Sequence, residues 1–102
     1  MYMNILLIRD DKPNSTKKYL AVIQDNGKIK KVRFGAKNYQ DYTIHNDQVR
    51  KNAYISRHKK NEDWNNIKTA GFWSKNLLWN KPTIKESIED IEKRFGVHIL
   101  YA

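Results

Sequence analysis

The chain has 102 residues, 39% of them hydrophobic, and it contains no cysteine. This length fits one domain with a modest core, and the missing cysteine excludes disulfides, thiolate metal ligands and cysteine nucleophiles. The longest apolar run near the start, residues 5–8, is too short for a membrane span or a signal peptide. We therefore expect a single domain over residues 1–102 that has no membrane span and is not secreted.

The formal net charge of +9 is concentrated in the middle of the chain. Residues 28–60 hold ten basic and two acidic side chains, whereas residues 1–27 and 61–102 are nearly balanced. A dense positive field attracts phosphate backbones, acidic protein surfaces or anionic lipids. A solvated face that only keeps the protein in solution is the alternative, although solubility needs much less charge.

The first three expected elements are strands. Residues 2–8 form an apolar run with β-branched members and predict a buried strand, and residues 18–23 predict a second one. The Asn-Gly pair at residues 26–27 predicts a hairpin with a third strand over residues 28–34. The apolar alternation of that strand fails across residues 30–31, which we interpret as a bulge.

A helix is expected after an irregular connection over residues 35–45. Asn46 or Asp47 can cap this helix, which runs to about residue 58. At 3.6 residues per turn, one narrow face holds Val49, Ala53 and Ser56. Another face, about a third of the circumference, carries basic and aromatic side chains: Arg50, Lys51, Tyr54, Arg57 and His58.

The last third of the chain predicts two helices and a strand. Residues 61–68 form a polar loop anchored by Trp64, and residues 69–80 predict a short helix that is apolar on all sides. Thr83 and Glu86 form a capping box, which satisfies free backbone N–H groups at the start of another helix. That helix has one apolar stripe, made of Ile84, Ile88, Ile91 and Phe95, and it ends at Gly96. Residues 97–101 can then add a final strand.

This element order implies an α+β fold. We expect a small antiparallel sheet, made of the N-terminal strand, the hairpin and the final strand. Two or three helices should pack on one face of that sheet.

The sequence gives little support for a bound metal or nucleotide. His45, His58 and His98 lack the i, i+3 or i+4 spacing of helical metal ligands. The four glycines stand too far apart to form a phosphate-binding loop before a helix. We therefore expect no cofactor and no metal.

Carboxylates suited to acid–base catalysis are not apparent either. Those of residues 86–92 are interpreted as solvated charges on the last helix, because they lie mostly off its apolar stripe. Asp10, Asp11 and Glu62 could hold a nuclease metal, but their spacing does not favour it. We expect a chain that is not an enzyme and has no small-molecule substrate.

Basic residues interleaved with aromatics are the one pattern with a binding mechanism. If the third strand and the following helix lie side by side, they form a continuous positive surface that contacts phosphates with little sequence preference. Its expected members are Lys28, Lys30, Lys31, Arg33, Lys37, Arg50, Lys51, Tyr54, Arg57, His58, Lys59 and Lys60. Tyr39, Tyr42 and Tyr54 either stack on bases or pack against the sheet.

Four larger aromatic side chains suit a core or a partner interface better than a base platform. They are Trp64, Phe72, Trp73 and Trp79.

Three stretches carry a resemblance to a known family: VRFGAKNYQDYT at 32–43, RHKKNEDWN at 57–65 and TAGFWSKNLLWNKPT at 69–83. With them, residues 18–96 resemble a family of small basic proteins of unknown function from large DNA viruses of eukaryotes. That family has no activity to carry over. The resemblance implies a viral setting, in the virion or in the host cytoplasm or nucleus.

Two functions follow as hypotheses. The first is a non-enzymatic virion-associated structural protein of the minor capsid or cement type, whose basic surface faces a polyanion; it rests on analogy with other small basic viral proteins. The alternative is a sequence-nonspecific protein that packages or handles viral DNA or RNA. The expected partner is thus nucleic acid or an acidic capsid-protein surface. An inhibitor that binds an acidic host factor also remains open.

Overall fold

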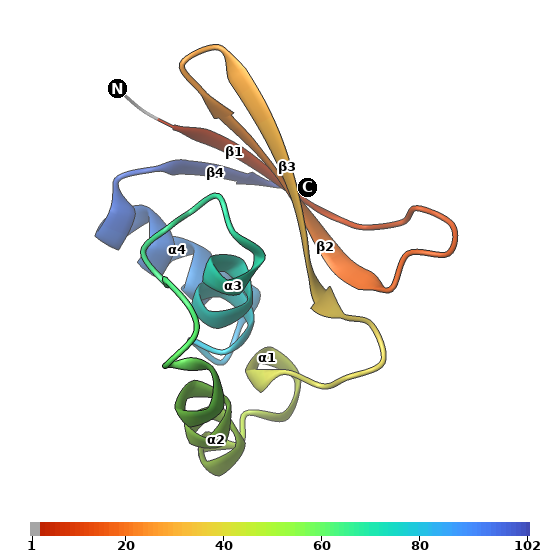
Figure 1. Cartoon of the computed structure of the whole chain (residues 1–102), viewed down its shortest axis with the longest axis vertical. Helices are drawn as coiled ribbons and strands as arrows, with labels where there is room; N and C mark the ends of the chain where they lie inside the picture. Colours follow the sequence, from red (N-terminus) through yellow and green to blue (C-terminus); the bar gives the residue numbers. More distant parts are fainter. Residues whose placement is uncertain (1–2) are drawn as a thin grey trace.

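Four strands form one mixed sheet in the computed structural model, which describes residues 3–102 (Figure 1). The spatial order is β3-β2-β1-β4. The strands are β1 (Asn4–Arg9), β2 (Lys17–Asp25), β3 (Lys28–Ala36) and β4 (His98–Tyr101). The predicted start of the first strand at Tyr2 lies outside the described residues.

The α+β class is confirmed, but the sheet is not antiparallel throughout. β1 pairs antiparallel with β2, and β2 with β3, whereas β4 runs parallel to β1. Parallel neighbours need a long crossover. The helices between β3 and β4 make the connection long enough for β4 to pair with β1 in either direction. In this structure β4 pairs parallel with β1.

The hairpin between β2 and β3 is regular. Asn26 and Gly27 both have left-handed backbones, with φ of 52° and 78°, which is the geometry of a two-residue type I′ turn. The pairing then continues without interruption to Tyr19 opposite Phe34, so the predicted bulge at residues 30–31 is wrong. The alternation fails there because Lys30, on the same side as Phe34, lies exposed near the turn.

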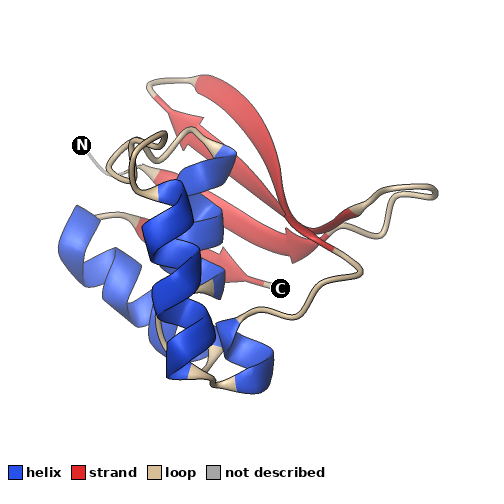
Figure 2. Ribbon diagram, turned by 60° about the horizontal axis from the view of Figure 1, so that its bottom comes forward, coloured by secondary structure: helices blue, strands red, loops and turns tan. Residues whose placement is uncertain are grey.

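All helices lie on one side of the sheet (Figure 2). They are α1 (Tyr42–His45), α2 (Gln48–His58), α3 (Ala70–Trp73), the π-helical turn η1 (Ser74–Leu78) and α4 (Ile84–Phe95). The predicted helix over residues 69–80 is therefore α3 continued by η1. The connection expected to be irregular contains the single turn of α1.

The helix ends follow the predicted capping chemistry. The Asp47 carboxylate accepts the backbone N–H groups of Val49 and Arg50 at the start of α2. Thr83 Oγ accepts the N–H of Glu86 at 3.2 Å, and the Glu86 carboxylate accepts the Thr83 hydroxyl rather than its N–H. Gly96 ends α4 with a φ of 63°.

The core lies between the sheet and the layer of α3, η1 and α4. Phe34 on β3 stacks against Tyr19 and against Trp73, with ring centroids 5.8 Å apart in both pairs. Phe72 and Trp73 are fully buried, and the Trp73 indole N–H donates to the Ile67 carbonyl at 2.8 Å. These two side chains are core residues, so the expectation that they contact a partner is corrected.

The opposite face of the sheet carries no helix among residues 3–102 (Figure 2). Leu6, Ile29 and Leu100 are exposed on it and border a shallow groove of about 280 Å³. No helix in this described range is long and apolar enough to cross a membrane.

Candidate functional site

The basic residues predicted to form one surface lie in separate regions. The hairpin turn that precedes Lys28, Lys30 and Lys31 lies at one end of the molecule's longest dimension, which is 40 Å, and α2 lies at the other end (Figure 1). α2 follows the connection after residue 36 and sits beyond the end of β3 rather than alongside it. The condition for one continuous positive surface is therefore not met.

Arg33 and Lys37 form an intermediate region beside Asp10. Arg33 Nε lies 3.2 Å from Asp10 Oδ2, and the Ser15 hydroxyl donates to the same oxygen at 2.6 Å. The Ser15 hydrogen bond, assisted by the charges of Arg33 and Lys37, holds the pKa of Asp10 below its usual 3.8. This acid offsets part of the positive charge of β3.

The face of α2 predicted to be a basic surface is in part its packed face. Tyr54 is only 8% exposed, whereas Val49, on the narrow face that it shares with Ala53 and Ser56, is 76% exposed. Lys51 Nζ donates to the backbone carbonyl of Asn80 at 2.6 Å, and burial, followed by the charge of Lys81, lowers the pKa of Lys51. Lys51 and Tyr54 are thus removed from the predicted polyanion-binding set.

A row of aromatic rings attaches α2 to the end of η1. Tyr54 stacks on Trp79 with centroids 4.6 Å apart and planes 3° apart, and His58 lies 4.4 Å beyond Tyr54. His45 lies 5.3 Å from Trp79 on the other side. Trp79 is therefore an internal anchor and not a free partner contact. Trp64 is half-buried, with Lys75 Nζ 5.3 Å from its ring centre.

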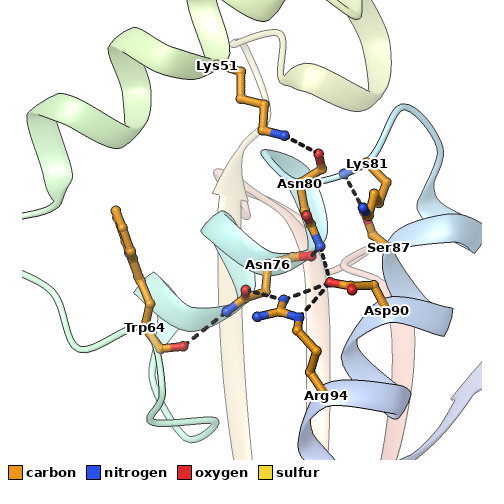
Figure 3. A network of polar contacts seen from close by, with 8 residues as sticks. All are labelled: Lys51, Trp64, Asn76, Asn80, Lys81, Ser87, Asp90 and Arg94. Atoms are coloured by element: carbon orange, nitrogen blue, oxygen red, sulfur yellow. Dashed lines mark hydrogen bonds and ion pairs between the residues drawn. The ribbon is translucent and has the colours of Figure 1, made fainter.

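A polar network ties the same region together (Figure 3). The buried Asn76 amide donates to the Trp64 carbonyl at 3.1 Å and accepts from Arg94 at 2.8 Å. Asn80 donates to Asp90 at 2.7 Å, and Arg94 Nε donates to Asp90 at 2.8 Å. Burial alone would raise the pKa of Asp90, but these two bonds lower it. The network links α2, the loop before α3, η1 and α4.

A cleft of about 550 Å³ opens between α2 and the adjoining ends of β2 and β3. Gly35 and Ala36 at the end of β3 form one wall, and Tyr54 and the aliphatic Leu78 contribute to the interior. This volume suits a small ligand or one unit of a polymer. We call it the α2 cleft; its charged and aromatic lining side chains are Lys17, Lys18, Tyr39, Asp41, Arg50, Tyr54, Arg57, His58, Glu62 and Trp79.

Lys18 and His58 of the cleft already contact acidic side chains. Lys18 Nζ lies 2.7 Å from Asp41 Oδ2, and both groups are largely buried. His58 Nδ1 lies 3.2 Å from Glu62 Oε1, and the other oxygen of Glu62 accepts the Trp64 indole N–H. These contacts shape the cleft, and the charges of Lys18 and Asp41 offset each other.

Three cations of the α2 cleft have no acidic partner within residues 3–102. They are Lys17, Arg50 and Arg57, and Arg50 has only a long 3.5 Å bond to Gln40. Tyr39 lines the same cleft and is 74% exposed. The cleft is therefore lined by these three cations and by one exposed aromatic ring. Lys59 and Lys60 lie exposed just past α2, outside the residues that line it.

Lys17 was missed at the sequence level because it precedes the charge-rich segment. The hairpin register supplies the missing signal, since pairing that starts at Asp25 opposite Lys28 places Lys17 opposite Ala36. Extending the register would have placed Lys17 beside the end of β3.

The carboxylates considered for catalysis do not form a cluster, and two of them contact other side chains. No group of three or more His, Asp or Glu side chains is placed to hold a metal in the part of the chain that the structure describes. Asp10 is bound by Ser15, and Glu62 by His58 and Trp64. Glu92 accepts the Ile99 N–H at 3.0 Å, so it is not simply a solvated helix charge as predicted.

Comparison with known proteins gives one family match. Residues 10–58 match the model of a family described as "Family of unknown function (DUF5754)", which is just under half of the chain. No curated protein and no solved structure matches the chain. The matched segment contains β2, β3, α1 and α2, and so includes every unpaired cation of the α2 cleft.

Proposed function

We propose that the chain binds single-stranded nucleic acid in the α2 cleft, through the sugar–phosphate backbone and without sequence preference. The observation that carries this proposal is that Lys17, Arg50 and Arg57 line one cleft and that none of them has an acidic partner within the described range. A positive groove beside an exposed aromatic ring is the usual arrangement for such binding.

The chemistry of each group fits a backbone contact. Arginine offers a planar fork of N–H donors that matches phosphate oxygens, and lysine offers a mobile point charge. Tyr39 can stack on a base of any sequence, because every base has a π-face. Arg50 and Arg57 are two helical turns apart on α2, about 10 Å along its axis, which lets them contact different phosphates.

The salt dependence of binding tests this proposal. Three phosphate contacts on a single strand predict a slope of about −2 when the logarithm of the association constant is plotted against the logarithm of the salt concentration. A labelled oligothymidine, titrated by fluorescence anisotropy at increasing salt, measures that slope. The combined change Lys17→Gln, Arg50→Gln and Arg57→Gln should bring it close to zero and weaken binding roughly tenfold or more at low salt.

A matched control removes the same charge from the other end of the molecule. Lys28→Gln, Lys30→Gln and Lys31→Gln together should leave the slope within about half a unit of that of the natural chain. Equal loss of slope in both triple variants would show diffuse attraction to net charge. That result would refute a site in the α2 cleft.

A virion-associated structural role is the second candidate. The observation in its favour is the uncovered apolar face of the sheet, where Leu6, Ile29 and Leu100 are exposed and suit contact with another protein. Proteomics of purified particles tests this role and the viral setting together. Absence of the chain from those particles would remove the structural role while leaving nucleic-acid binding untouched.

A further inference from the structure

The outer edge of β3 is long and open. β3 is the last strand on its side of the sheet and has nine residues without proline. Its backbone bonds to β2 alone along residues 28–34, as far as the described chain shows. An open edge of this kind is a template for another strand, and natural proteins normally protect it.

The side chains of this edge carry unbalanced positive charge. Lys28, Lys30 and Lys31 are exposed and have no acidic partner anywhere in residues 3–102. Lysines on an edge strand repel a second copy of the same strand, because an added copy would bring like charges together. The same lysines favour a strand of opposite charge. We call Lys28–Arg33 the β3 edge.

We propose that the β3 edge binds an extended acidic segment of a partner protein as a fifth strand of the sheet. The partner's backbone pairs with the free backbone groups of β3, and its carboxylates lie opposite the lysines. Ile29 is 65% exposed among these lysines, so the segment should carry an apolar residue between acids. This proposal does not depend on the α2 cleft.

The backbone geometry favours a protein strand over a nucleic acid. In a two-residue hairpin the residues flanking the turn bond to each other, and outward-facing backbone groups then alternate with bonded ones. Since Asp25 pairs with Lys28, the N–H and C=O groups of Ile29, Lys31 and Arg33 face away from β2. Alternating donors and acceptors at this spacing match another β-strand. A phosphate backbone accepts hydrogen bonds but offers no donors in that pattern.

The test uses the full chain and two synthetic peptides. The first is a labelled, end-capped peptide of about ten residues that combines Glu with Val and Thr. The second has the same sequence with every backbone N–H methylated, which keeps the charge but removes all the donors that strand pairing needs. We expect the first peptide to bind, and to protect the amides of Ile29, Lys31 and Arg33 from hydrogen exchange.

Two comparisons make the outcome decisive. The methylated peptide should bind the natural chain about tenfold more weakly than the unmethylated peptide does. The unmethylated peptide should bind the Lys28→Gln, Lys30→Gln, Lys31→Gln variant about tenfold more weakly than it binds the natural chain. The Lys17→Gln, Arg50→Gln, Arg57→Gln variant should bind the peptide like the natural chain. Equal binding of both peptides, no binding to the natural chain at low salt, or displacement of the peptide by oligothymidine would each overturn the proposal.

Discussion

The α2 cleft and the β3 edge each carry three cations that have no acidic partner among residues 3–102, but they present them in different ways. In the cleft, side chains from β2 and α2 converge on a hollow of about 550 Å³ beside an exposed tyrosine. On the edge, the lysines lie along one strand next to unpaired backbone groups. The first arrangement suits a flexible polyanion and the second an extended polypeptide. Both regions have the same number of these cations, so the surrounding backbone decides what each can bind.

The largest expected effect is on stability, and it should differ between α2 and the hairpin of β2 and β3. Trp79→Ala removes the ring on which Tyr54 stacks, and we expect the free energy of unfolding to fall by about 3 kcal/mol. Hydrogen exchange should show loss of protection in α2 and little change in the hairpin of β2 and β3. Tyr39→Ala, which removes an exposed ring, is the control for stability. Equal loss of protection in both regions would show that α2 is not docked independently.

Substitutions at two glycines, one near each end of β3, test how tightly each end is packed. Gly27 and Gly35 both have a φ of +78°, so alanine is strained at either position. A Cβ on Gly27 meets nothing within 4 Å, whereas one on Gly35 lies 2.7 Å from a Leu78 methyl. Gly35→Ala should lower the free energy of unfolding by about 2 kcal/mol and Gly27→Ala by about 1 kcal/mol, measured in urea. A larger cost at Gly27 would contradict the packing of β3 against η1.

Tyr39 distinguishes the two proposed ligands. Tyr39→Ala should weaken oligothymidine binding by about 1 kcal/mol or more, because a stacked base loses its platform. Tyr39→Phe keeps the ring and should bind nearly as well as the natural chain. Peptide binding at the β3 edge should not change in either variant, and anisotropy measures both ligands. Unchanged oligothymidine affinity in Tyr39→Ala would leave the cations alone to account for binding.

Acidification tests the contacts of Asp10 with Ser15 and Arg33, which lie between the two regions. The pKa of Asp10 is lower in the folded chain, so its carboxylate stabilises the fold above pH 3.8 and loses this contribution as the pH falls through the folded-state value. Asp10→Asn should therefore be less stable than the natural chain at pH 7, with the gap closing below about pH 4. Asp11→Asn removes the same charge from an exposed neighbour and is the control for the loss of one negative charge. A gap that persists at acid pH would assign the effect to packing.

The parts of the fold predicted correctly are those governed by local chemistry. The Asn-Gly turn, the caps at Asp47 and Thr83 and the terminator Gly96 each satisfy backbone groups within a few residues. The parallel direction of β4 could not be predicted, because a final strand can pair with β1 in either direction after a long crossover.

The candidate site was predicted only in part, for a reason visible on α2. Its sequence leaves Tyr54 either free to stack on a base or packed inside, and it is packed, since Trp79 offers a stacking partner from a distant segment. Arg50 and Arg57 were predicted and do line the cleft, whereas Lys51 turns inward to a carbonyl. Side chains that depend on partners more than twenty residues away are not specified by local periodicity.

Mapping both ligands onto one protein sample tests the central claim most directly. Backbone amide shifts in an NMR titration with oligothymidine should change around residues 17–18, 35–41 and 50–58 and stay constant at 28–31. The acidic peptide should produce the opposite pattern in the same sample. If both ligands shift the same amides, the molecule has one general cationic surface and the division into two sites is contradicted.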